Sequence, residues 1–247
     1  ISALETSDVA ALGSAQLAAL SSTQAAKLST DQVASLTASE VKGLTTAVVS
    51  KLSSAQLQAL TTNATASLTT SQVGAMATSQ VAALTSAQVA NLTTGQFNAL
   101  GTTLVKAIEL ADIVGIDNTR MDALTTAQIA ALSTSQVAEL TTQQLANLET
   151  VQLTNMATQQ IASLTSSQAA ALTTAQVSAL TSANAAGLTT TALNALSSSQ
   201  VAKLTTNVVS TLTTAQLQAF GSDQIAGLTT AQINNLTTAA VASFSTD

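Results

Sequence analysis

The sequence predicts an all-α solenoid: a superhelix of very short helices of one to two turns, with one helix in each eight-residue repeat. Three observations predict it. Leucine recurs at every eighth position from Leu4 onward, a second apolar residue follows each leucine after five positions, and the residues between them are typical of a helix start. Because an unbroken short period marks a repeat architecture, the repeat decides the fold class.

Two apolar columns run through the whole chain. The leucine column has 31 positions, of which 25 are Leu and none is polar. The second column runs from Val9 to Val241, and the exceptions among its 30 members are Ala25, Thr65, Ala169 and Ala185. We therefore expect a single continuous solenoid over residues 1–247, with a degenerate segment at 101–122 where the consensus is weakest.

Each octad encodes a helix start. The consensus is x-Leu-Thr-Thr-Ala-Gln-Val-Ala, and the run from Leu124 to Ala131 is typical of it. Thr125 is the expected N-cap and Gln128 its N3 partner, which together make a capping box. Leu124 and Ile129 then occupy the two positions of a hydrophobic staple. The pattern predicts helices about five or six residues long, each followed by a sharp bend.

Residues that tolerate a left-handed backbone lie near the expected helix ends. These are Gly43, Gly115, Gly187, Gly227, Asn91 and Asn147. Helices this short are not stable alone, so neighbouring octads must bury their apolar columns against one another. The residues Glu40, Asp112 and Asn184 replace the usual Gln at intervals of 72, a spacing that suits three octads per superhelical turn.

A β-solenoid is the alternative fold, because it also stacks identical residues in ladders. Three features argue against it. A spacing of five places Leu and Val on opposite faces of a strand, and the chain has only 9 Gly and no Pro to make turns. Ala and Gln are also poor strand formers. One continuous helix is disfavoured because eight residues overshoot two turns by about 80°, so the leucines would wind around it.

The composition excludes several classes of function. The chain has no Cys and no His, so disulfides, thiolate or imidazole metal sites and a Ser-His-Asp triad are all ruled out. Its net charge of −6 opposes binding to nucleic acid. No stretch of about 18 apolar residues could span a membrane as a helix. We expect no enzyme activity and no cofactor.

The degenerate segment carries the one candidate metal site, and it is a weak one. Asp112, Asp117, Asn118 and Asp122 could supply oxygen ligands for calcium. The Asp-x-Asp-x-Asp-Gly spacing of an EF-hand is absent. The simpler interpretation is a drifted segment in which acidic residues such as Glu109 pair with nearby bases.

The polar columns allow further interpretations. Regular Thr and Ser rows are similar to the ice-facing arrays of antifreeze solenoids, although here the two hydroxyl residues are adjacent. The Gln column could form amide ladders, but capping at N3 is the favoured interpretation.

The run Leu-Thr-Thr-Ala-Gln-Val-Ala-Ala-Leu resembles the octapeptide arrays (x-Leu-Thr-Thr-x-Gln-Val-x) of very large secreted or surface proteins of Gram-negative bacteria. The resemblance covers the whole chain and implies an extracellular, structural or adhesive role. The segment Leu-Thr-x-x-Gln-Val also resembles a helix start in transcription-activator-like effector repeats. That second resemblance ends there, because the period differs and this chain is acidic.

Self-association is the expected interaction. The chain begins at Ile1 without Met, so we expect it to be processed, excised or incomplete. Octads run nearly to both ends without polar capping repeats, which favours head-to-tail or lateral assembly. The sequence therefore predicts a spacer, stalk or filament subunit of a bacterial cell surface, with other surface components as further partners. The alternative is an adhesive or ice-binding module that uses the Thr/Ser-rich outer face.

Overall fold

The computed structural model describes residues 1, 3–242 and 244, and every regular element in them is a short helix. The helices are four to six residues long, one in each octad, and the described residues contain no strand. The all-α solenoid-like fold is therefore confirmed, and the β-solenoid alternative is not supported.

The chain divides into two compact units, Ile1–Leu124 and Thr125–Asp247, each treated separately below. The expectation of one continuous array over residues 1–247 stays a prediction. The boundary follows directly after the degenerate segment. The helices of the first unit are α1 (Thr6–Ala10), α2 (Ser14–Ala18), α3 (Ser22–Ala25), α4 (Thr30–Ala34), α5 (Ala38–Gly43), α6 (Thr46–Val49), α7 (Ser54–Ala59), α8 (Thr62–Ser67), α9 (Thr70–Gly74), α10 (Thr78–Ala82), α11 (Ser86–Asn91), α12 (Thr94–Ala99), α13 (Gly101–Val105), α14 (Leu110–Ile113) and α15 (Asn118–Ala123).

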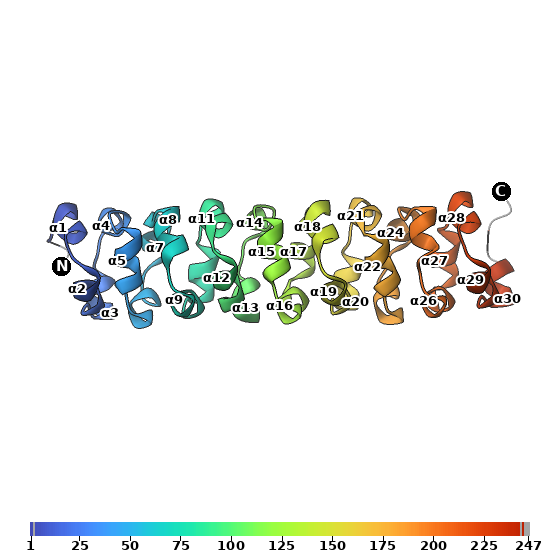
Figure 1. The fold of residues 1–247 in the computed structure, drawn as a ribbon, viewed down its shortest axis with the longest axis horizontal. Coiled ribbons are helices and arrows are strands. Elements are labelled where there is room, and N and C mark those ends of the chain that lie inside the picture. The colour runs from blue at the N-terminus through green and yellow to red at the C-terminus, as the bar shows by residue number, and fades with distance from the viewer. Residues whose placement is uncertain (2, 243, 245–247) are drawn as a thin grey trace. The chain divides into compact units, whose positions relative to one another are not determined.

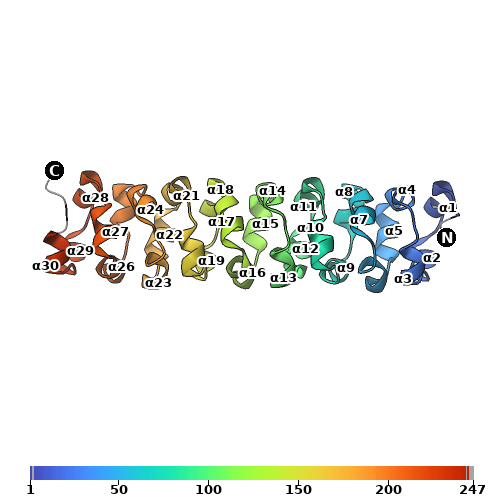
Figure 2. The same ribbon diagram turned by 180° about the vertical axis from the view of Figure 1, so that it is seen from behind.

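The second unit repeats the same plan. Figure 1, and Figure 2 from behind, show the short helices of each unit joined by brief extended segments. The helices of the second unit are α16 (Thr126–Ala131), α17 (Thr134–Glu139), α18 (Thr142–Asn147), α19 (Thr150–Thr154), α20 (Thr158–Ala162), α21 (Ser166–Ala171), α22 (Thr174–Ala179), α23 (Ser182–Ala185), α24 (Thr190–Asn194), α25 (Ser198–Val201), α26 (Thr206–Thr211), α27 (Thr214–Gln218), α28 (Ser222–Ala226), α29 (Thr230–Asn234) and α30 (Thr238–Ala242).

Capping boxes start the helices, as predicted. At α16 the Gln128 backbone N–H donates to Thr125 Oγ1 over 3.2 Å, and the Thr125 N–H donates to Gln128 Oε1 over 2.9 Å. Thr125 itself is extended, with φ −68° and ψ 157°, as an N-cap residue should be. The reciprocal pair satisfies two N–H groups that a helix start otherwise leaves without a partner.

The bends between helices do not use left-handed residues, and that expectation is wrong. Leu132 (φ −55°, ψ 140°) and Ser133 (φ −70°, ψ 159°) are both extended, and these two residues alone turn the chain into the next helix. The one described residue with a positive φ is Gly101, at 61°. The residues predicted to adopt left-handed conformations, none of which does so, are Gly43, Gly115, Gly187, Gly227, Asn91 and Asn147.

Within each unit, helices pack on the helix three octads earlier. In the first unit α5 packs on α2 and α8 packs on α5, and in the second α21 packs on α18 and α24 on α21. Three octads, or 24 residues, therefore make one superhelical turn within each unit. Three such turns account for the 72-residue spacing of the sequence.

The two apolar columns form the core. Leu57 and Phe97 of the second column are fully buried, and Leu60 and Leu100 of the leucine column are 3% and 2% exposed. The first and last octads are less covered, with Leu4 38% and Val241 45% exposed. Burial of both columns is what holds these otherwise unstable short helices in place.

Candidate functional site

The buried Gln column is the most elaborate polar feature of the molecule. In Gln56 the side-chain oxygen accepts a hydrogen bond from the Ser53 N–H over 2.7 Å, which completes the capping box of α7. Its Nε2 group donates to the carbonyl oxygens of Leu28 (2.7 Å) and Ala25 (3.1 Å) one turn earlier. A single side chain thus caps its own helix and ties it to the preceding turn.

The same pair of cross-turn bonds recurs throughout both units. The carbonyl acceptors lie 28 and 31 residues before the glutamine, in the leucine column and the second apolar column respectively. Glutamines that donate to both include Gln32, Gln56, Gln72, Gln80, Gln88, Gln96, Gln160, Gln168, Gln176, Gln200, Gln216, Gln224 and Gln232.

Two replacements of Gln keep a donor at this position. Asn184 accepts from the Thr181 N–H over 3.1 Å and donates through Nδ2 to the Met156 carbonyl over 3.1 Å. Arg120 donates through Nε to the Leu92 carbonyl, and its guanidinium pairs with Asp117, the N-cap residue of its own helix. The cross-turn bond therefore survives a change of side chain when the new group can donate.

Two of the three acidic replacements, Glu40 and Asp112, are buried and cannot donate when ionised. Glu40 is 8% exposed and keeps the capping half of the pattern, because Oε2 accepts from the Thr37 N–H over 2.6 Å. Asp112 is 4% exposed, and the described structure contains no hydrogen bond to its carboxylate. Apolar residues at this position, such as Val48 and Ala192, also lack a side-chain donor, but Glu40 and Asp112 place a carboxyl group there instead.

The calcium candidates do not converge in the structure. Asp112 is the buried N3 residue of α14, and Asp117 caps α15, where it is paired with Arg120. Asn118 is the first residue of α15, and Asp122 is exposed. Among the described residues no three His, Cys, Asp or Glu side chains come together as a metal site would require. Binding of calcium by this set of residues stays a prediction.

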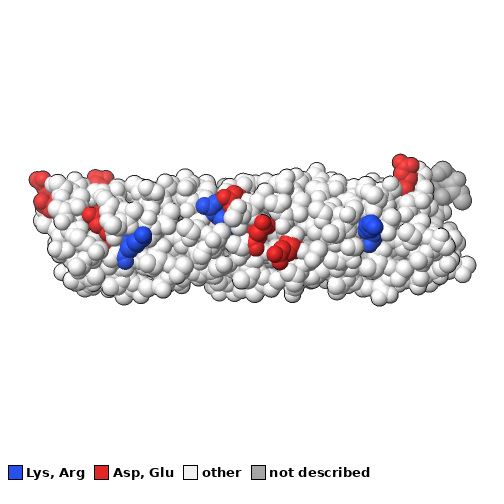
Figure 3. All heavy atoms as spheres, in the orientation of Figure 1, with Lys and Arg blue, Asp and Glu red and all other residues white. Residues whose placement is uncertain are grey.

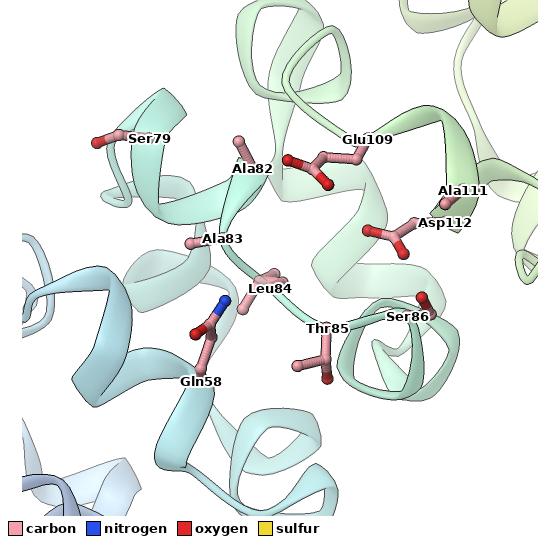
Figure 4. Close-up of a pocket in the computed structure, with 10 residues that line it drawn as sticks. All are labelled: Gln58, Ser79, Ala82, Ala83, Leu84, Thr85, Ser86, Glu109, Ala111 and Asp112. Carbon is pink, nitrogen blue, oxygen red and sulfur yellow. The ribbon is translucent and has the colours of Figure 1, made fainter.

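A hollow lies beside Asp112. It has a volume of about 580 Å³ and is lined by the α11 start on one side and the α14 start on the other. Figure 4 shows the Glu109 and Asp112 carboxylates extending into it from the same side. Apart from Gln58 and Leu84, its other lining residues are alanines or hydroxyl residues, so Glu109 and Asp112 are its two carboxyl groups.

The outer surface is largely uncharged. On the face in Figure 3 the few acidic and basic side chains lie singly or in small groups, with wide stretches of other residues between the groups. The second hydroxyl residue of the octad is exposed in many repeats, for example Thr134, Thr142 and Thr174. Within the described ranges, the helices are all too short to cross a bilayer.

Sequence reasoning found the N3 capping role of Gln but missed its second role. The signal was present: a capping box accepts Glu as readily as Gln, yet the column holds 19 Gln and one Glu. Only the amide can also donate, so this imbalance indicated an acceptor elsewhere in the fold. The amide ladders considered for the Gln column are replaced by bonds from side chain to backbone.

Comparison with known proteins places the repeat in a family. The model of the ALTTAQ repeat matches residues 1–38, 66–103, 105–150, 145–182 and 209–238. No curated protein matches the chain. The matched ranges cover well over half of the sequence and include both units. The chain therefore belongs to the ALTTAQ repeat family.

Proposed function

We propose that this chain is a structural spacer or stalk at a bacterial cell surface. The observation that supports it is that the same two sets of hydrogen bonds recur in many octads. In these octads a Thr or Ser and a Gln cap the helix, and the same Gln ties it to the preceding turn, as in the bonds from Gln176 to Leu145 and Leu148, both 2.8 Å. An array of this kind becomes longer when similar octads are added, and this property suits a spacer that holds two other parts of a structure at a fixed distance.

The surface location rests on the resemblance of the octads to arrays of secreted and surface proteins. Antibody labelling of intact cells that produce the chain tests it, with a cytoplasmic protein as control. We expect intact cells to be labelled and a protease added outside to remove the signal. Labelling only after the cells are opened would overturn the proposed location.

The spacer role is tested by varying the number of octads. Chains with about 12, 18 and 24 octads, which are whole numbers of turns at roughly three octads per turn, are measured by small-angle X-ray scattering. We expect the maximum dimension to rise in proportion to the number of octads. A compact globular protein of equal mass serves as the control, because its dimension grows only weakly with chain length. Growth as weak as the control's would contradict a spacer.

Self-association is part of the same proposal. The partly exposed Leu4 and Val241 would be buried by a second array placed against them, and a contact of this head-to-tail kind makes a filament. Light scattering over a range of concentrations distinguishes a filament-forming subunit from a monomeric spacer. An apparent molecular mass that increases with concentration supports the filament. A constant mass equal to that of the monomer contradicts the filament and supports a monomeric spacer.

The alternative function is adhesion or ice binding through the outer hydroxyl rows. The observation that favours it is that the exposed second hydroxyl, as in Thr134 or Thr142, is not the one that caps the helix. Glycan arrays and thermal hysteresis measurements test it. Activity that disappears when these second hydroxyl residues are replaced by Ala would support the alternative over a passive spacer.

A further inference from the structure

The hollow between α11 and α14 contains a polar group without a partner. Asp112 is 4% exposed, yet no hydrogen bond reaches its carboxylate in the described structure, and no Lys or Arg there pairs with it or with Glu109. The carboxylate lines the hollow (Figure 4). A carboxylate held this deep without a partner is costly unless a cation or a donor joins it.

The same pair of acids behaves differently elsewhere in the chain. In the first octad, Glu5 and Asp8 have the spacing of Glu109 and Asp112, and there the Glu5 N–H donates to Asp8 Oδ2 over 3.0 Å. Helix α14 lacks this bond. The Asp112 carboxylate is therefore not used for capping, although its sequence context would allow it.

A backbone acceptor in the hollow also lacks its usual donor. The Leu84 carbonyl lies 28 residues before Asp112, where a Gln would supply an amide N–H. The equivalent oxygens of Leu52 and Leu60 receive such bonds from Gln80 and Gln88, at 2.7 and 2.8 Å. Within the described residues nothing donates to Leu84 O. Leu84, Glu109 and Asp112 thus line one hollow and bring to it a carbonyl without a donor and two carboxyl groups.

The second unit contains the same hollow in its ordinary form. It has a volume of about 460 Å³, and Leu196, Ser198 and Gln224 stand where the first has Leu84, Ser86 and Asp112. Gln224 donates to Leu196 O over 2.6 Å, and Gly221 occupies the position of Glu109. The unusual feature of the first hollow is thus its pair of carboxylates, since the surrounding shape is common to the repeat.

We propose that Asp112 and Glu109, with the Leu84 carbonyl and the Ser86 hydroxyl, bind a calcium ion. Calcium prefers carboxylate, carbonyl and water oxygens and tolerates irregular geometry, and the open hollow admits the waters that complete its shell. Two carboxylates balance its charge. In this position the ion replaces the side-chain amide of Gln. It binds both the Asp112 carboxylate and the Leu84 carbonyl, and so joins α14 to the preceding turn. With only two carboxylates, we expect dissociation constants of about 0.1–1 mM.

The test compares the thermal stability of the full chain, and calorimetric binding, with calcium chloride against sodium chloride of equal ionic strength. We expect the melting temperature to rise and then saturate with calcium. Asp112→Gln should abolish the rise, and without calcium it should melt above the wild type because the amide donor to Leu84 O is restored. Glu109→Gln, at an exposed position, should weaken binding without loss of folding.

The matched controls are Asp223→Asn, beside the ordinary hollow, and Asp8→Asn, in the capping pair of the first octad. Both should keep the full response to calcium. A wild type that shows no response at about 10 mM calcium, ten times the weakest affinity expected, would overturn the proposal. Equal responses from the wild type, Asp112→Gln and Glu109→Gln would overturn it as well, because the ion would then bind elsewhere.

Discussion

At the scale of single residues, the amide of glutamine decides the chemistry of the fold. Gln176 uses its oxygen to accept from the Thr173 N–H (2.8 Å) and its nitrogen to donate to Leu145 and Leu148. A glutamate side chain could accept the hydrogen bond from the Thr173 N–H, but it could not donate to the two carbonyls. Because buried backbone carbonyls must find donors, an acceptor-only side chain leaves the turn below unsatisfied.

Replacement of Gln176 by Glu tests this division of labour. Gln176→Glu keeps the acceptor for Thr173 but removes the donors and buries a charge, so we expect the free energy of unfolding to fall by about 2–4 kcal/mol. Urea denaturation measures it. Gln143→Glu, at an exposed position, is the control and should change stability by less than about 0.5 kcal/mol. Equal losses would mean that the cross-turn bonds contribute nothing.

The reverse exchange should stabilise the chain. Glu40 already accepts from the Thr37 N–H, and Glu40→Gln adds an amide that can donate toward the carbonyls of Val9 and Leu12, 31 and 28 residues earlier. We expect a gain of about 1 kcal/mol, seen as a higher urea midpoint. Glu139→Gln, at an exposed position of α17 away from this column, serves as the comparison and should leave the midpoint nearly unchanged. A midpoint for Glu40→Gln at or below the wild type would contradict the argument.

The capping pair Thr125 and Gln128 could be predicted from sequence because both partners lie within four residues. The cross-turn partner of a Gln could not, since it lies 28 residues away and its identity depends on the number of octads per turn. The neighbours of Asp112 could not be predicted from the sequence for the same reason. Sequence proximity grouped it with Asp117 and Asp122, whereas the fold places it beside Leu84 and Ser86.

At the scale of the helix, the starts were predictable and the ends were not. A start is encoded by local hydrogen bonds, while an end such as Leu132 is fixed by the stacking of the next turn. The glycines near helix ends serve that stacking. A Cβ added to Gly43 would lie 2.5 Å from the Ser14 carbonyl oxygen, so glycine is needed there for the close approach of α5 to α2.

Two glycine replacements should therefore have opposite effects. Gly43→Ala must push apart two backbones, and we expect a loss of about 1–3 kcal/mol. Gly95→Ala meets only the Thr70 methyl at an ordinary 3.5 Å inside α12. It should gain about 0.5–1 kcal/mol from helix propensity. Thermal unfolding of both variants measures whether each change raises or lowers stability. A Gly43→Ala variant more stable than the wild type would show that the approach of Gly43 to the Ser14 backbone is not tight.

At the scale of the whole molecule, any octad can follow any other. The Gln bonds always reach the leucine column and the second apolar column one turn earlier, whichever octads stand there. Only the eight-residue spacing of the columns has to be kept. This explains how the sequence can drift at Asp112 or Arg120 without a shift in the position of the helices that follow.

Deletions of eight and of four residues test whether stability depends on the spacing of the two apolar columns or only on the composition of the chain. Removal of residues 166–173, one octad, keeps both columns aligned, so we expect unchanged helical signal per residue and a melting temperature within a few degrees of the full chain. Removal of residues 166–169 shifts every later column by half an octad and places polar residues opposite Leu and Val. That chain should lose helical signal and melt at least about 10 °C lower, since many apolar contacts are lost. If both deletions melt alike by circular dichroism, the octads do not stack through their columns, and the cross-turn glutamine bonds lose their structural basis.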